Sequence, residues 1–267
     1  MKYIASCSFG KDSLAMVLLL MEKGYPLDEV VFYDTGMEFN AIYHNRDLLV
    51  PLLQERGISY VELHPSNPFE YDMLYRPVCS KQKGKHSGYG WCGGVSRWGT
   101  TSKTKIIDRY KLSLNEEITE YIGIAADEPK RVRDKNYPLI EWGMTELDCL
   151  SYCYKNGWHW FEQTRDDKQI ELYDVLDRVS CWCCCNKNRK ELKNIYLFLP
   201  EYWEKLKTLQ AQIERPMKKF VHNGISYGNV FDMEKIFENE IISAQSSPMV
   251  SSETNNKAIN EEQEVKT

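Results

Sequence analysis

The chain has 267 residues, 42% of them hydrophobic, with a formal net charge of −5 and nine cysteines. This length predicts one or two domains, and the apolar content excludes a wholly disordered chain. The negative charge excludes a protein that holds nucleic acid through an overall basic character.

Two further features bear on the compartment. The longest apolar run, from Leu14 to Met21, is too short to cross a membrane, and the N-terminus lacks the apolar segment of a signal peptide. An odd number of cysteines in such a chain is typical of a reducing compartment rather than of a secreted disulfide framework. We therefore expect a cytoplasmic protein with thiol or metal chemistry and without a membrane partner.

The first half alternates between short apolar runs and helical patterns. Strands are predicted over residues 2–8, 29–35, 59–64 and 120–125, and helices over residues 12–23 and 38–54, the second kinked or broken at Pro51. This alternation predicts an α/β fold with a mainly parallel, Rossmann-like sheet flanked by helices, over residues 1–143.

After Tyr137 the pattern becomes mostly helical. Helices are predicted over residues 145–156, 189–198 and 201–215, with Thr145 as the N-cap of the first. We predict residues 144–243 as a helical, cysteine-rich region packed on the first domain. Residues 244–267 are rich in Ser, Asn and Glu and hold no aromatic residue, which predicts a disordered tail.

A long stretch without clear periodicity, residues 65–99, separates the third and fourth predicted strands. From Arg76 to Lys111, here called the basic stretch, nine Lys and Arg stand against one acidic residue, interleaved with Trp91 and Trp98. Concentrated basic charge with aromatic residues predicts a contact surface for phosphate, sulfate or nucleic acid. An ordinary solvated surface is the alternative.

The sequence SFGKDS at residues 8–13, here called the Ser8 loop, lies between the first predicted strand and the first predicted helix. Gly10 permits a tight turn, so backbone N–H groups and the positive end of the helix face one point. Lys11 adds a positive charge, Ser8 and Ser13 add hydroxyl donors, and Asp12 can hold Mg²⁺ or orient the loop. The pattern predicts a phosphate or pyrophosphate site, with Lys11 and Asp12 as catalytic residues.

Two common nucleotide-binding motifs do not account for this loop. A Walker A motif needs Ser or Thr after its lysine, whereas Asp12 follows Lys11. A literal G-x-G-x-x-G occurs at Gly88, Gly90 and Gly93, but it follows no predicted strand and opens no clear helix.

The Ser8 loop resembles the SGGKDS-type pyrophosphate loop of the adenine nucleotide alpha-hydrolase-like (PP-loop) superfamily, and within it the phosphoadenosine phosphosulfate (PAPS) reductase family. Three further segments resemble that family in the same order: DTGMEF at residues 34–39, GIAADEPKR at residues 123–131, and the stretch from Tyr137 to the helix predicted at Thr145. The resemblance covers residues 1–215.

This resemblance implies a HUP-type fold that binds an adenine nucleotide, ATP or PAPS, on the Ser8 loop. It implies that Asp34 and Thr35 lie at a strand end beside the nucleotide, that Gly123 lets the backbone approach it, and that Arg131 meets its phosphates. A turn role at the strand end is the alternative for Asp34. Ala125 stands where the family often has arginine, so no anion contact is implied there.

Four cysteines fall within residues 181–185, here called the cysteine segment. Cys181 and Cys184 have the C-x-x-C spacing that can place two thiolates on one ion. Cys149 and Cys153 are four residues apart on a predicted helix and share one face. Together the four predict a site for Zn²⁺ or a [4Fe–4S] cluster. Cys183 is the predicted nucleophile.

Other roles are open for these pairs. Cys79 and Cys92 in the basic stretch are the rival second pair for the metal site. Cys149 and Cys153 also suit ordinary core packing, because a buried cysteine behaves as a small apolar residue.

Three hypotheses about function follow. In the first, PAPS or a similar sulfonucleotide binds the Ser8 loop, and a thiolate attacks its sulfur to release sulfite with the help of a thiol reductant. In the second, ATP adenylates a nucleic acid held by the basic stretch, and a thiolate or cluster-bound sulfur displaces AMP. The third is a non-catalytic nucleotide- and metal-binding module. Adenine-nucleotide binding is common to all three.

The resemblance has one gap that concerns mechanism. Assimilatory members of the family use a catalytic cysteine in a C-terminal tail, whereas no cysteine follows Cys185 here. A mechanism through a C-terminal thiolate is therefore not implied.

Overall fold

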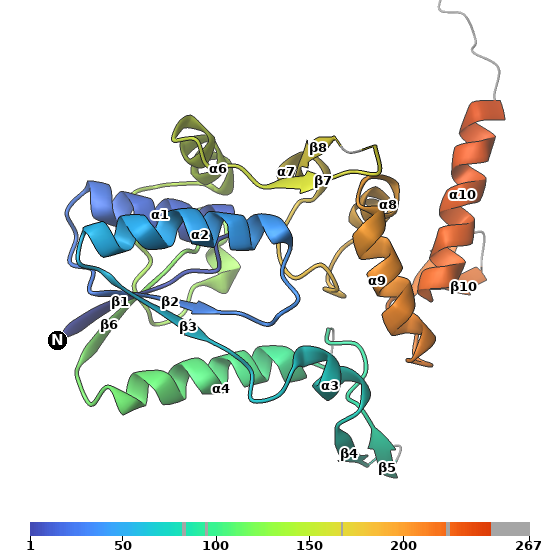
Figure 1. The fold of residues 1–267 in the computed structure, drawn as a ribbon, viewed down its shortest axis with the longest axis horizontal. Helices are drawn as coiled ribbons and strands as arrows, with labels where there is room; N and C mark the ends of the chain where they lie inside the picture. Colours follow the sequence, from blue (N-terminus) through green and yellow to red (C-terminus); the bar gives the residue numbers. More distant parts are fainter. Residues whose placement is uncertain (82–83, 94–95, 167, 223–224, 247–267) are drawn as a thin grey trace, which may run out of the picture.

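A four-stranded parallel sheet forms the centre of the fold (Figure 1). The computed structural model describes residues 1–81, 84–93, 96–166, 168–222 and 225–246. The strands are β1 (Lys2–Ser6), β2 (Glu29–Tyr33), β3 (Ser59–Leu63) and β6 (Ile118–Ile122), in the order β3-β2-β1-β6, and each neighbouring pair is parallel. All of β2 is buried, as expected of a strand covered on both faces. The predicted α/β fold is confirmed.

Helices cover both faces of this sheet. α1 (Lys11–Glu22) and α2 (Asn40–Glu55) lie on one face, and α4 (Trp98–Ser113) lies on the other (Figure 1). α2 continues through Pro51, so a break there is wrong. Pro51 is exposed, and water can therefore hydrogen-bond the carbonyl that loses its partner in the preceding turn.

The region predicted to be irregular contains defined structure. α3 (Phe69–Leu74), the antiparallel pair β4 (Pro77–Ser80) and β5 (Gly84–Ser87), and the start of α4 fall within residues 65–99. The prediction failed because these elements lack an apolar stripe. α4 has no buried residue, so no hydrophobic periodicity marks it in the sequence.

The second half contains the predicted helices but also short strands. Its elements are η1 (Pro129–Arg131), α5 (Pro138–Glu141), α6 (Glu146–Lys155), β7 (Phe161–Gln163), β8 (Gln169–Glu171), α7 (Leu172–Val175), α8 (Arg189–Phe198), α9 (Pro200–Ala211), β9 (Phe220–His222), β10 (Ile225–Tyr227) and α10 (Val230–Ser246). Thr145 caps α6 in a capping box with Asp148, as predicted for an N-cap.

One apolar core joins the two halves of the chain. α6 packs against α1, and the indole N–H of Trp160 donates to the Phe9 carbonyl at 2.7 Å. The division at residue 143 stays a prediction. α10 extends through residues 244–246, so the predicted tail begins later than expected, and its remainder, residues 247–267, lies outside the described residues. Among the helices that the structure describes, none is long and apolar enough to cross a membrane.

Candidate functional site

The Ser8 loop lies where the strand order of the sheet reverses. The chain passes from β1 to β2 on one side, and β6 pairs with β1 on the other side. In open parallel sheets, ligands bind outside the carboxyl ends of the strands at such a point. The Ser8 loop follows β1 and Gly123 follows β6, so both lie at the edge of the sheet where a ligand is expected.

Gly123 touches the backbone of the Ser8 loop. A Cβ atom at Gly123 would lie 2.7 Å from Ser13 Cα and 2.9 Å from the Ser13 nitrogen, so any larger residue would displace the loop. Gly123 therefore permits close contact with the Ser8 loop, and its approach to a nucleotide stays a prediction.

Hydrogen bonds from both halves of the chain hold the Ser8 loop. The Ser13 hydroxyl oxygen accepts from the Ser8 N–H at 3.0 Å, and the Tyr173 hydroxyl accepts from the Lys11 N–H at 2.9 Å. Gly10, the N-cap residue of α1, has no side chain that could accept from the first turn. Other N–H groups of its first turn are therefore suited to bind an anion.

Phe9 gives this loop an unusual backbone. Its φ is 56°, in the left-handed region that bulky side chains disfavour, and it stands where the SGGKDS-type loop has glycine. The Phe9 ring is fully buried and packs edge-on against Phe32, with ring centroids 5.0 Å apart. Burial of the ring offsets the backbone strain, so the turn forms without a second glycine.

Lys11 Nζ lies between two carboxylates. It donates to Asp12 Oδ1 at 3.0 Å and to Glu146 Oε2 at 2.6 Å, and the side chain is 8% exposed. Burial opposes the charge of Lys11, but Asp12 and Glu146 outweigh it and raise the Lys11 pKa above its ordinary value. Lys11 is therefore charged at neutral pH and can exchange a carboxylate for a phosphate oxygen.

Asp34 and Thr35 follow β2 and form a turn. Asp34 Oδ1 accepts hydrogen bonds from the Gly36 N–H and the Tyr43 hydroxyl, both at 2.8 Å. This is the turn role that the sequence left open for Asp34. The Thr35 hydroxyl donates to Glu38 Oε1 at 2.8 Å. A nucleotide role for both residues stays a prediction.

Arg131 lies in η1, at the rim of this region. It pairs with Glu128 and remains exposed. Glu128 lies close enough to Asp12 to add to the rise that burial causes in the Asp12 pKa. Arg131 is thus linked to the Ser8 loop through Glu128, and its contact with phosphate stays a prediction.

The four cysteines predicted as one metal site do not meet the spacing of a single-ion site. α6 packs against α1, Cys149 and Cys153 are fully buried, and the Cys153 thiol donates to the Lys11 carbonyl at 3.5 Å. Across residues 1–246, apart from the short gaps in the description, no three cysteines have sulfurs within 4.8 Å of one another. The packing of Cys149 and Cys153 against α1 is the core role that the sequence left open, and the set of Cys149, Cys153, Cys181 and Cys184 as ligands of a cluster stays a prediction.

The cysteine segment instead lies beside the Ser8 loop and the turn after β2. The Trp182 N–H donates to the Met37 carbonyl at 2.9 Å. The carbonyl of Val179, two residues before Cys181, lies 3.5 Å from where a Cβ atom on Gly10 would be. The residues around the cysteine segment thus contact the loop that is predicted to bind phosphate and the turn after β2.

Cys92, rather than Cys79, comes close to the cysteine segment. A Cβ atom on Gly93 would lie 3.5 Å from the Cys185 sulfur. The Cys92 sulfur accepts hydrogen bonds from two N–H groups at the start of α4 and interacts electrostatically with Cys184. Cys79 lies on β4 and is exposed.

Burial dominates the chemistry of these thiols. It raises the pKa of Cys185 to about 12, and it raises the pKa of Cys92 despite the N–H groups of α4. The Cys181 thiol lowers the pKa of Cys183 through a hydrogen bond, but burial and neighbouring thiols outweigh this and raise it. Cys183 is 4% exposed. The predicted nucleophile is therefore a neutral thiol unless a cation stabilises its thiolate.

Sequence reasoning missed two cations and a carboxyl group between the Ser8 loop and the cysteine segment. Lys103 on α4 lies over the Tyr33 ring, with Nζ 5.9 Å from the centroid. Lys187 is 3% exposed and donates to the Arg178 carbonyl at 3.2 Å. Both lysines oppose the rise that burial causes in the pKa of Glu38. The basic stretch signalled Lys103 only as one of nine charges, and nothing in the sequence distinguished Lys187.

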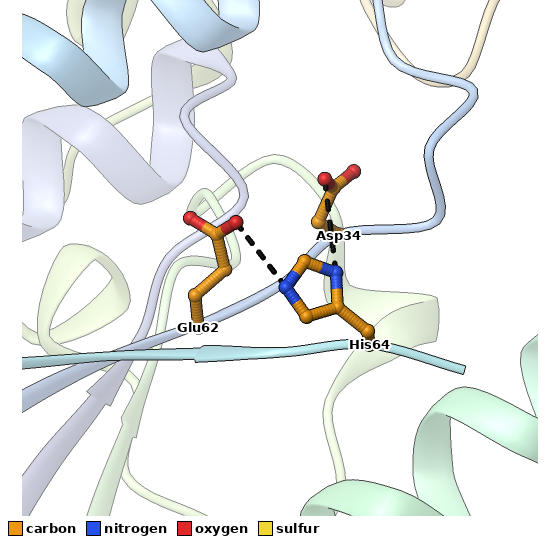
Figure 2. A group of neighbouring side chains, drawn as sticks. All are labelled: Asp34, Glu62 and His64. Carbon is orange, nitrogen blue, oxygen red and sulfur yellow. Dashed lines mark ion pairs between the residues drawn. The ribbon is translucent and has the colours of Figure 1, made fainter. Parts of the chain in front are cut away.

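A separate group of three side chains lies at the ends of β2 and β3. Figure 2 shows His64 between the carboxylates of Asp34 and Glu62. His64 Nδ1 lies 3.9 Å from Asp34 Oδ2, and His64 Nε2 lies 3.4 Å from Glu62 Oε1. One ligand atom from each residue lies within 4.8 Å of the others, and within the described residues this is the one group of three or more metal-binding side chains that meets that limit.

Three comparisons place these features among known proteins. An uncharacterized protein of Methanocaldococcus jannaschii, MJ0066, is 26% identical over 203 residues, which cover 74% of this chain and 39% of that protein. This chain therefore spans about two fifths of that relative. A solved structure of the U34-tRNA thiolase NcsA from Methanococcus maripaludis, with its [4Fe-4S] cluster, aligns with 91% of this chain and 73% of its own at 14% identity and a TM-score of 0.38.

The third comparison concerns the N-terminal part. The sequence model of the phosphoadenosine phosphosulfate reductase domain matches residues 2–69, which include the Ser8 loop, α1 and the turn after β2. The resemblance seen in the sequence is thereby confirmed for this segment. Residues 2–69 of the chain match the phosphoadenosine phosphosulfate reductase domain family.

Proposed function

We propose that this chain is an enzyme that binds an adenine nucleotide on the Ser8 loop and carries out sulfur chemistry at the phosphate or phosphosulfate end of that nucleotide. The observation that carries the proposal is the position of the chain around the cysteine segment, because Val179, two residues before it, contacts Gly10 and Trp182 within it bonds to Met37. The family match over residues 2–69 supports the nucleotide.

The loop offers a complete set of contacts for a phosphate group. The start of α1 supplies N–H donors, and Lys11 supplies a charged donor that now pairs with Glu146. Asp12 would hold Mg²⁺ on the phosphates, because a carboxylate is the side chain that this ion prefers. Lys103 and Lys187 would balance negative charge that approaches from the side of the cysteine segment.

For a metal centre, Cys92 with Cys181, Cys184 and Cys185 replaces the set predicted from sequence. A Zn–S bond of about 2.3 Å places the sulfurs of a tetrahedral site about 3.8 Å apart. No three cysteines of the described residues lie within even 4.8 Å. A [4Fe–4S] cluster spans more space and therefore fits the spacing better than a single Zn²⁺ ion. When bound, such a cluster would stabilise thiolates and supply electrons or sulfur.

The leading reaction is reduction of a sulfonucleotide. A thiolate, with Cys183 as the predicted residue, attacks the sulfur, the S–O bond to the nucleotide phosphate breaks, and the nucleotide leaves with the electron pair. A second thiolate then attacks the cysteine sulfur that carries the sulfonate group, the bond between the two sulfurs breaks, sulfite leaves with the electron pair, and a disulfide forms. An external thiol reductant restores the two thiols.

A second candidate is ATP-dependent sulfur transfer to a nucleic acid. Lys105 and Arg109 are exposed on α4, where they can contact a phosphate backbone. An acceptor oxygen would attack the α-phosphorus of ATP with loss of pyrophosphate, and sulfur would then displace AMP. The raised pKa of Cys183 favours this candidate, because cluster-bound sulfur needs no free thiolate.

The test begins with protein purified without oxygen and analysed for iron, zinc and sulfide. It is then incubated separately with PAPS plus dithiothreitol, with ATP alone, and with ATP plus tRNA or DNA. Sulfite from PAPS supports sulfonucleotide reduction. AMP and pyrophosphate formed only with nucleic acid support sulfur transfer. Nucleotide binding without turnover in any mixture would contradict both enzymatic proposals.

Variants test the loop itself. Lys11→Ala should weaken binding of ATP or PAPS by about tenfold or more, since a charge-assisted hydrogen bond is lost. Lys23→Ala, which removes an exposed lysine just after α1, is the matched control and should leave affinity unchanged. Equal affinity in Lys11→Ala and wild type would show that the nucleotide binds elsewhere.

A further inference from the structure

We propose that Asp34, Glu62 and His64 form a binding site for a divalent transition-metal ion, separate from the cysteines and from the Mg²⁺ position at Asp12. Adjacent parallel strands bring the three together, because Asp34 follows β2 and the other two lie at the end of β3. This inference does not depend on the proposed function.

The hydrogen bonds of the two carboxylates leave one oxygen of each facing the histidine. Asp34 Oδ1 is occupied by the Gly36 N–H and the Tyr43 hydroxyl, which leaves Oδ2 toward His64. Outer hydrogen bonds of this kind orient metal ligands.

Glu62 is arranged in the same way. Its Oε2 accepts from the Tyr60 hydroxyl and from Arg46 at 3.4 Å, and its Oε1 faces His64 Nε2 (Figure 2). Each carboxylate is therefore fixed through one oxygen and presents the other.

A rotation of the His64 ring closes the site on an ion. Ligand bonds of about 2.0–2.2 Å place the ligand atoms on one ion about 3 Å apart. His64 now presents Nδ1 to Asp34 and Nε2 to Glu62, whereas an ion binds one of these nitrogens, and one ligand atom from each residue already lies within 4.8 Å of the others. His64 is 57% exposed, whereas Asp34 is 12% exposed and Glu62 23%, so the histidine is the residue free to adjust.

The ligand set selects the class of ion. One imidazole with two carboxylates suits Mn²⁺, Fe²⁺ or Zn²⁺ better than Mg²⁺ or Ca²⁺, which prefer oxygen ligands alone. Three protein ligands leave further coordination positions open, and the exposed side of His64 gives solvent or a small anion access to them.

Binding of Mn²⁺ to protein purified without oxygen, followed by electron paramagnetic resonance, tests the site. Mn²⁺ is the chosen probe because the buried thiols would compete for Zn²⁺. No nucleotide is present, so failure of this proposal and failure of the nucleotide proposal are distinguishable. Wild type should bind one Mn²⁺ that His64→Ala and Glu62→Gln each weaken by at least about tenfold, since even outer-shell changes cost about 10–100-fold.

Two controls complete the experiment. His159→Ala removes a histidine that pairs with a single carboxylate, with Nδ1 3.2 Å from Glu171 Oε2, and should leave Mn²⁺ affinity unchanged. Asp12→Asn should also leave it unchanged. If wild type binds no Mn²⁺, or if His64→Ala binds it as tightly, the proposal is overturned and His64 is an ordinary hydrogen-bonded partner of two carboxylates.

Discussion

The Ser8 loop and the cysteine segment lie beside each other, but the chain builds them in different ways. Six consecutive residues, which follow β1 and include the first turn of α1, form the Ser8 loop. The sulfur group is assembled from Cys92, just before α4, and from residues 181–185, just before α8. A local turn determines the first region, whereas the second exists only when distant segments pack together.

The largest expected effect shows whether metal is bound by the cysteine segment or by Cys149 and Cys153 on α6. A double variant with Cys181→Ala and Cys184→Ala should lose essentially all bound metal, because half of the proposed ligands are removed. The matched double variant with Cys149→Ala and Cys153→Ala should keep its metal and lose about 1 kcal/mol of stability per site. Metal analysis of protein purified without oxygen gives the answer. Loss of metal in both variants would restore the ligand set predicted from sequence, which contains all four cysteines.

The next effect concerns packing around the Ser8 loop. Gly123→Ala should lower the free energy of unfolding by about 1–3 kcal/mol, because its Cβ atom would overlap Ser13. Gly10→Ala should change it by less than about 1 kcal/mol, since the nearest atom, the Tyr173 hydroxyl oxygen, lies 3.4 Å away. Urea denaturation measures both. Equal stability in the two variants would mean that a Cβ atom at Gly123 does not displace the Ser8 loop.

A smaller effect concerns the charge of Lys103 on α4. Lys103→Ala should weaken nucleotide binding by about tenfold, or about 1.4 kcal/mol, because its charge lies beside the strand ends. Lys105→Ala is the matched control on the same helix, where the side chain is exposed, and should have no effect. Calorimetric titration with PAPS or ATP measures both affinities. Equal losses in the two variants would indicate only a diffuse effect of the basic charge.

The smallest effect appears at alkaline pH and concerns the α6 pair. Burial raises the pKa of Cys149 from 9.0 to about 12. Such a thiol stabilises the fold below pH 9 and loses this contribution as pH rises toward 12, because the unfolded chain releases its proton first. Cys149→Ala should therefore flatten the decline in stability over this range, measured by denaturation at several pH values.

Cys79→Ala is the control for the alkaline experiment. This variant removes an exposed thiol on β4 and should decline with pH as wild type does. If the stability of Cys149→Ala falls with pH as steeply as that of wild type, groups other than Cys149 cause the alkaline loss of stability.

The sequence predicted the parts of the fold that carry strong local signals. The apolar runs predicted the four parallel strands, and Thr145 predicted the start of α6. α4 escaped prediction because it buries no residue. The other elements within residues 65–99 are too short to show a clear periodicity in the sequence. The sequence predicts a kink or a break at Pro51, but α2 continues through this exposed residue.

The candidate site divides in the same way. SFGKDS by itself determined the strand–loop–helix turn and its relation to the PAPS reductase domain, because a phosphate loop is built by neighbouring residues. Spacing alone could not decide which cysteines meet. Two thiols four residues apart share a helix face whether that face meets a metal or the core, and the packing of α6 on α1 decided for the core. The approach of Cys92 to residues 181–185, and of His64 to Asp34, depends on contacts between separate segments, which only the tertiary structure decides.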